Sequence, residues 1–197
     1  MIDPRVESNR LGFPVFTGPG NLNLYAVRSR SSHAGRFDDV LGLFGQTSLG
    51  GFFHKIWPVT LDPGLHYLKH FYPGQSACAV YAPGFYRAAY AIGTHIDHQA
   101  LVQIGPISIF RDGNMNDVID PDPDNIDSGL FGMNVHSPFV YDLDFAKKDV
   151  VGQKSAGCIV HEVPANHEEM MGIIKRNISL NGRTLSIKVF SERGDGI

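Results

Sequence analysis

Cysteine is nearly absent from this sequence: only Cys78 and Cys158 occur among 197 residues. Two cysteines could form one disulfide at most, whereas domains held together by disulfides carry several pairs. We therefore expect two free thiols. Cys78 lies in an apolar stretch, Ala77 to Tyr81, which favours a buried strand and a cysteine that acts as a small apolar side chain.

Long apolar runs and a strong charge imbalance are also lacking. No apolar run approaches the roughly 18 residues that span a bilayer, so we expect no membrane insertion. The net charge is only -3, which gives no reason to expect binding to nucleic acid. Residues 1–7 lack the basic and apolar segments of a signal peptide. We therefore expect synthesis in the cytoplasm and, for any action outside it, another route of delivery.

Glycine and proline, in contrast, are frequent, at 22 and 12 residues, and 43% of the chain is hydrophobic. This composition indicates a turn-rich, mainly β protein with one core rather than a helical bundle. Residues 1–20 predict an irregular N-terminal arm, and residues 21–191 predict a single domain. Alternating or apolar runs predict strands at residues 21–28, 36–43, 51–59, 76–81, 85–92, 101–104, 107–110, 131–136 and 184–190.

One helix is predicted from Pro164, because proline suits the first turn of a helix. Lys175 and Arg176 suit its C-terminal end. Four residues at positions i, i+3, i+4 and i+7 form one face, which we expect to pack on the strands: His167, Met170, Met171 and Ile174.

A histidine followed by Ser-x-Gly-Cys is the most informative pattern in the chain. Cys158 follows Gly157 where a polar stretch becomes apolar, and His136 lies upstream at the end of a predicted strand. Glycine lets the backbone approach a substrate closely, and the Gly157 and Cys158 amides could converge on a developing oxyanion. Because a histidine can draw the thiol proton and hold the sulfur as thiolate, the pair is a candidate for nucleophilic catalysis.

This pattern resembles the signature of the L,D-transpeptidase (YkuD-like) family. That signature is a histidine, a somewhat shorter gap than here, then Ser/Thr-His-Gly-Cys, an apolar residue and usually Asn or Arg. Here His136 is followed, after eighteen residues, by Ser155-Ala156-Gly157-Cys158-Ile159-Val160. The resemblance covers residues 131–162.

The resemblance implies a YkuD-like β-sandwich with one or two short helices packed on it. It also implies an enzyme, a cysteine acyltransferase or peptidase that acts on peptidoglycan stem peptides and requires no cofactor. By resemblance, Cys158 is the nucleophile and His136 its general base, with the carbonyl of Ser137 orienting the imidazole. Gly157 and Cys158 would supply the oxyanion amides, and Ser155 would shape the turn.

Two positions depart from the family signature, because Ala156 replaces its histidine and Val160 replaces its Asn or Arg. The looser Ser-x-Gly-Cys pattern is similar to that of L,D-transpeptidase-like toxins delivered by type VI secretion and of bacteriophage proteins. We therefore expect action at the cell wall after delivery by phage lysis, in a virion or by a secretion system. The departures also leave open a catalytically inactive cell-wall-binding or virion structural module. A papain-like peptidase is disfavoured, since its cysteine precedes its histidine.

A second cluster of oxygen-bearing side chains could hold a structural calcium ion. Asp112, Asn114, Asn116 and Asp120 stand at offsets 0, 2, 4 and 8, a spacing with which a loop can wrap a hard cation. The segment lacks the central glycine and the final Glu of an EF-hand, so an Asn/Asp-rich turn is the alternative. The Asp-Pro loop that follows could add ligands or simply remain solvated.

The remaining histidines suggest two weaker possibilities. His161 and His167, with Cys158 and His136, could ligate zinc, but their spacing matches no common structural zinc site. We expect His161 and His167 to lie on the surface or on a helix face. Residues 94–98, Thr-His-Ile-Asp-His, predict a hairpin tip, or side chains that line a substrate groove.

Overall fold

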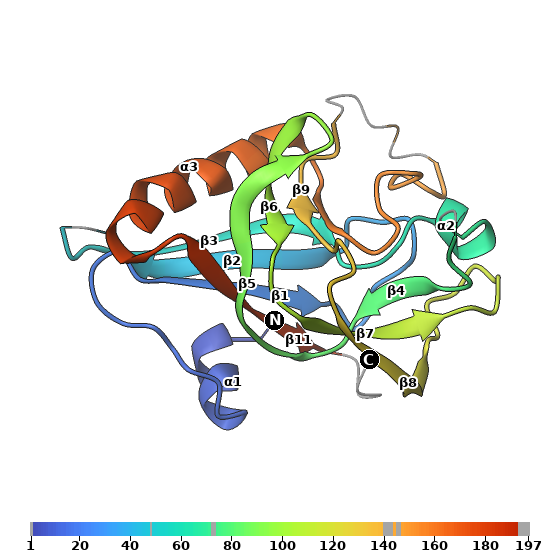
Figure 1. Ribbon diagram of the computed structural model, residues 1–197, viewed down its shortest axis with the longest axis horizontal. Coiled ribbons are helices and arrows are strands. Elements are labelled where there is room, and N and C mark those ends of the chain that lie inside the picture. Colours follow the sequence, from blue (N-terminus) through green and yellow to red (C-terminus); the bar gives the residue numbers. More distant parts are fainter. Residues whose placement is uncertain (1, 48, 72–73, 140–143, 145–146, 193–197) are drawn as a thin grey trace.

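The computed structural model describes the chain except residues 1, 48, 72–73, 140–143, 145–146 and 193–197, and only the backbone of residues 178–181. Its strands form one closed eight-stranded barrel and a separate three-stranded sheet beside it (Figure 1). The prediction of a mainly β fold is confirmed. The large sheet closes on itself, however, which differs from the sandwich expected from the family resemblance.

The barrel is built from strands at both ends of the chain. Its order is β1 (Leu22–Arg28), β11 (Thr184–Ser191), β5 (Gly84–His95), β6 (His98–Gln103), β9 (Val135–His136), β10 (Ile159–His161), β3 (Phe52–Thr60) and β2 (Asp39–Gln46). The neighbouring pairs are antiparallel except β1 with β11 and β9 with β10, which are parallel. The two shortest strands, β9 and β10, close the barrel.

The small sheet has the order β4 (Cys78–Tyr81), β7 (Ile107–Asp112) and β8 (Asp122–Gly129). The turns at residues 82–84 and 105–106 carry the chain between this sheet and the barrel, so the strands on either side of each turn do not pair with one another. The Asp-Pro segment expected as a loop is largely β8. It is an exposed edge strand, where Pro123 costs no ladder hydrogen bond.

The sequence predicted an irregular arm over the first twenty residues. The structure differs, because these residues contain the helix α1 (Pro4–Arg10). The Asp3 carboxylate caps this helix by accepting a hydrogen bond from the Arg5 amide at 2.9 Å, and Pro4 occupies its first turn. A single turn of helix, α2 (Leu65–Lys69), was also not predicted. It packs with the small sheet in a separate apolar cluster.

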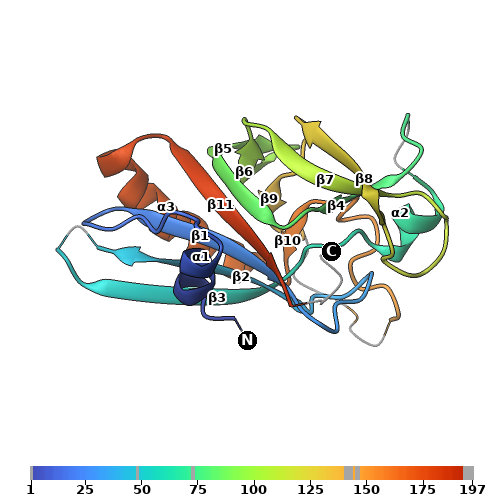
Figure 2. The ribbon, with the colours of Figure 1, turned by 90° about the horizontal axis from the view of Figure 1, so that it is seen from below.

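The predicted long helix is α3 (Pro164–Asn181), which lies on the opposite side of the barrel from α1 (Figures 1 and 2). Its predicted face is buried, and Met170, Met171 and Ile174 join the apolar core of the barrel. None of the described helices is long and apolar enough to cross a membrane.

A buried ion pair ties the barrel to the small sheet. Arg28, at the end of β1, is fully buried and donates to Asp62 Oδ1 at 3.1 Å and to the carbonyl of Tyr81 in β4 at 3.0 Å. Ser32 donates to the second Asp62 oxygen at 2.6 Å. The bond from Arg28 to Tyr81 links the barrel to the small sheet. Asp62 compensates the buried charge of Arg28, so removal of either partner would leave an unpaired buried charge.

Candidate active site

A cleft of about 650 Å³ opens where the small sheet meets the β9–β10 edge of the barrel. Its walls come from α2, β4, β7, the β5–β6 turn and the segments on either side of β9 and before β10. The residues that line it are Tyr67, Gln75, Ala79, His95, Ile96, Arg111, Phe131, Gly132, Met133, His136, Pro138, Phe139, Gln153, Lys154, Ala156 and Cys158. His136 and Cys158, the predicted base and nucleophile, are therefore in one cleft.

Parallel pairing of β9 and β10 brings these two residues together. His136 is opposite Val160, and the Ile159 amide donates to the carbonyl of Asn134 at 2.9 Å. Cys158 thus lies beside Asn134, two residues along the ladder from His136. Because side chains in a strand alternate between faces with a period of two, Cys158 and His136 face the same side.

The segment before β9 is fixed by hydrogen bonds to its backbone. Gln103 Oε1 accepts from the Phe131 and Met133 amides, each at 3.0 Å. The buried hydroxyls of Tyr81 and Tyr90 lie 2.7 Å apart, and both are within hydrogen-bond distance of the carbonyl of Met133, at 3.0 and 2.9 Å. This support holds the cleft wall that faces the sulfur of Cys158.

His136 is held in one tautomer. Its Nδ1 donates to the carbonyl of Ser137 at 2.7 Å, as the resemblance implied, and a carbonyl can only accept, so the lone pair lies on Nε2. The ring stacks on Phe139, with centroids 4.9 Å apart, and is tilted against His95, whose centroid is 4.7 Å away. Burial lowers the pKa of His136 to about 3. His136 is therefore a neutral imidazole with an acceptor nitrogen.

The sulfur of Cys158 points along the cleft wall. It donates to the carbonyl of Gly132 at 3.6 Å and accepts from the Asn134 amide at 3.4 Å. Among the described residues, no hydrogen bond joins it to His136, whose Nε2 is buried without a partner. Burial raises the pKa of the Cys158 thiol to about 11, although the Asn134 amide opposes this shift. The resting pair is thus a thiol and a neutral imidazole, not the thiolate that the sequence suggested.

The turn before Cys158 requires glycine. Gly157 has φ +136°, and a Cβ there would lie 2.5 Å from the carbonyl oxygen of Ala79. Ser155 is buried and shapes the turn as predicted, since its hydroxyl donates to the Cys158 carbonyl at 2.8 Å. The same hydroxyl oxygen accepts from the Gly157 amide at 3.1 Å. That amide is already bonded, so of the two predicted oxyanion donors only the Cys158 amide remains.

Three residues in or beside the cleft were not connected with Cys158 and His136 from the sequence. Asn134 contacts Cys158 through its backbone, His95 bonds to the Asn134 side chain, and Phe139 stacks on His136. Residues 94–98 do form a hairpin tip, since His95 pairs with His98, yet His95 also lines the cleft. Strand alternation could have identified Asn134, which lies two residues before His136.

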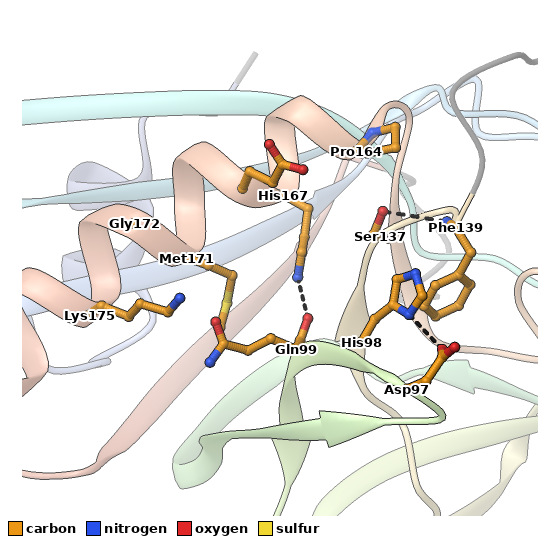
Figure 3. A pocket seen from close by; sticks show the side chains of 11 residues that line it. Asp97, His98, Gln99, Ser137, Phe139, Pro164, His167, Met171, Gly172 and Lys175 are labelled. Atoms are coloured by element: carbon orange, nitrogen blue, oxygen red, sulfur yellow. Dashed lines mark hydrogen bonds and ion pairs between the residues drawn. The ribbon is translucent and has the colours of Figure 1, made fainter.

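A second cavity, of about 470 Å³, shares Phe139 with the cleft; its lining residues are drawn in Figure 3. α3 forms one wall, with Pro164, His167, Met171 and Lys175, and the β5–β6 turn forms the other, with Asp97, His98 and Gln99. His167 Nε2 bonds to the Gln99 carbonyl at 2.8 Å and so joins the two walls. Phe139 lines both cavities.

The predicted calcium loop is closed by its own hydrogen bonds. Asp112 Oδ2 accepts from the Asp120 amide at 3.1 Å, and the Asn114 side-chain amide donates to Asp120 Oδ1 at 2.7 Å. Asn116 Oδ1 accepts from the Val118 amide at 2.7 Å. These side-chain oxygens accept hydrogen bonds within the turn. Calcium binding stays a prediction.

The zinc alternative receives no support from the described residues, which contain no group of three or more His, Cys, Asp or Glu that could hold a metal ion. His161 was expected near the surface but is fully buried. Its ring lies against Trp57 and His167, with centroids 6.0 and 5.2 Å away. His167 is on the buried face of α3.

Compared with protein-family models, with curated proteins and with solved structures, the chain gives no match. The function proposed below therefore rests on the geometry of the cleft.

Proposed function

We propose that the protein is a cysteine-dependent enzyme of the L,D-transpeptidase type, which transfers or hydrolyses acyl groups of peptidoglycan stem peptides. The observation that carries this proposal is the pairing of β9 with β10, which puts Cys158 and a histidine with a free Nε2 lone pair in one cleft. The barrel with its small sheet would then be a variant of the YkuD-like scaffold.

The charge of the cleft fits an acidic peptide. Arg111 and Lys154 line it, and none of its described lining residues is Asp or Glu. Stem peptides carry free carboxylates, and cationic walls in a partly desolvated cleft attract such groups. Arg111 pairs with Asp127 Oδ2 at 2.7 Å, which fixes the position of its guanidinium but offsets part of its charge.

In the proposed reaction, the Cys158 thiol turns from the Gly132 carbonyl toward His136 as the substrate binds. Nε2 of His136 takes the thiol proton while the sulfur attacks the scissile carbonyl carbon. The C–N bond then breaks, and His136 returns the proton to the leaving amine. An amine or water attacks the resulting thioester, gives its proton to His136, and the sulfur leaves and recovers that proton. A neutral resting pair suits this order, because proton transfer accompanies attack.

Purified muropeptides test the proposal. We expect wild-type protein to convert tetrapeptide stems, measured by mass spectrometry, to the tripeptide by hydrolysis or to an exchanged peptide when glycine is supplied as the amine. Cys158→Ala should yield neither product. Identical product profiles for the two proteins would refute the proposed enzymatic activity.

The inactive module is the second candidate, and a specific observation favours it: the described structure has no hydrogen bond between Cys158 and His136. Catalytic hydrogen bonds are often longer before substrate binds, so we place it second. Binding of wild type and Cys158→Ala to peptidoglycan sacculi, with no turnover by either, would establish it.

A further inference from the structure

We propose that His95 is the second donor of the oxyanion site, which holds the substrate acyl oxygen through its Nε2 proton while Cys158 attacks. This inference rests on the proposed function of the same cleft. The Gly157 amide donates to Ser155 Oγ and cannot serve as the second oxyanion donor. The site therefore needs a second donor besides the Cys158 amide.

The tautomer of His95 is determined by its neighbours. The Gln103 backbone amide donates to Asn134 Oδ1 at 3.0 Å, which fixes the orientation of the Asn134 side chain. Its Nδ2 group therefore faces His95 Nδ1, 3.1 Å away, as a donor. Since Nδ1 accepts, the proton of a neutral His95 lies on Nε2.

The two imidazoles of the cleft thus have complementary roles. His136 presents a lone pair on Nε2, because its Nδ1 donates to Ser137, whereas His95 presents an N–H. Their ring centroids are 4.7 Å apart. Burial lowers the pKa of His95, so its N–H belongs to a neutral ring that keeps its proton throughout the reaction.

Asn134 connects His95 to the nucleophile. The backbone amide of Asn134 contacts the Cys158 sulfur, and its side chain contacts His95. One residue therefore positions both groups, on the wall that the Ile159–Asn134 hydrogen bond ties to β10. His95 is also partly exposed in the cleft, where an acyl oxygen can reach it. It brings a polar group into a site where Ala156 has none.

The test compares variants that keep or remove the donor. His95→Phe keeps a ring without an N–H, His95→Ala is a second donorless variant, and His95→Gln keeps an N–H donor. His98→Phe, at the other end of the same turn, is the matched control. For each we would measure kcat/KM on tetrapeptide muropeptides, the rate of Cys158 alkylation by iodoacetamide, and the thermal unfolding midpoint.

We expect both donorless variants to lose about 10²- to 10³-fold in kcat/KM, the usual effect of removing an oxyanion donor. Alkylation should be unchanged, because it develops no acyl oxyanion. His95→Gln should retain at least about tenfold more activity than His95→Phe, and His98→Phe should resemble wild type. A folded donorless variant with wild-type turnover, or equal losses of turnover and alkylation, would overturn the proposed role of His95 and leave the proposed function standing. Wild-type protein without turnover would instead overturn the proposed function and this inference together.

Discussion

The two cysteines of this chain occupy different environments, because Cys78 is buried and Cys158 is partly exposed. Burial raises the thiol pKa of Cys78 to about 12 and that of Cys158 to about 11. Each thiol also donates to a backbone carbonyl: Cys78 to Tyr67 at 2.9 Å, and Cys158 to Gly132 at 3.6 Å. Ground-state ionisation therefore does not separate the proposed nucleophile from the structural thiol.

The surroundings do separate them. Cys78 lies within β4 in an apolar cluster, with the Asp112 carboxylate near enough to raise its pKa further. Cys158 opens onto a cleft, receives the Asn134 amide, and shares that cleft with His136. Because a thiol becomes a nucleophile only when a base can take its proton and a substrate can reach it, reactivity is expected at Cys158 alone.

The largest effect should come from removing each sulfur in turn. Cys158→Ala should lower turnover of tetrapeptide muropeptides by at least about 10⁴-fold, since loss of a nucleophile removes the covalent route. Cys78→Ala should stay within about threefold of wild type in the same assay. Comparable losses in both variants would remove the distinction between the two thiols.

Removal of the proposed base should have the next largest effect. His136→Gln should lower turnover by about 10²- to 10⁴-fold, the usual contribution of general acid–base catalysis. His98→Gln, outside the cleft, is the control and should match wild type. Full activity of a folded His136→Gln protein would show that another group accepts the Cys158 proton.

The pH dependence of alkylation compares the thiols directly. Only the thiolate reacts, and a raised pKa reduces its fraction at neutral pH. Iodoacetamide modification of Cys158 should therefore rise about tenfold per pH unit, or roughly 100-fold from pH 7 to 9. Peptide mapping should show slower modification of Cys78 throughout. A Cys158 rate that is already constant from pH 6 would indicate a preformed thiolate–imidazolium pair instead.

The smallest effect concerns the residue before each cysteine. Gly157→Ala should destabilise the fold by about 1–3 kcal/mol, because its backbone conformation and the Ala79 carbonyl leave no room for a Cβ. Ala77→Gly should cost less than about 1 kcal/mol. Urea unfolding measures both, and equal costs would show that the turn at Gly157 relaxes.

Local patterns explain how much of the fold could be predicted. Most strands, and the buried face of α3, follow from the alternation and spacing of apolar residues. Closure of the barrel could not be predicted, because β9 and β10 have only two and three residues and their pairing joins segments distant in sequence. The helix α1 was not predicted because it is short and is followed by a segment rich in proline and glycine, although Asp3 and Pro4 suit the start of a helix.

The part of the candidate site that lies in a local sequence motif could be predicted. Cys158, His136 and the Ser137 carbonyl follow from a local motif and strand pairing. The use of the Gly157 amide by Ser155 and the burial of His161 depend on how the turn and α3 pack. The sequence placed His95 in a hairpin tip or along a substrate groove, but its contact with Asn134 could not be predicted, since that contact depends on the order of strands in the barrel.

The most direct test of the account is the mass of the intact protein during turnover. Wild-type protein would be mixed with tetrapeptide muropeptide, quenched with acid and analysed by mass spectrometry and peptide mapping. We predict one acyl adduct, mapped to Cys158, which forms equally in Cys78→Ala and is absent from Cys158→Ala. No adduct on wild-type protein, or an adduct that persists in Cys158→Ala, would contradict the assignment of Cys158 as the nucleophile.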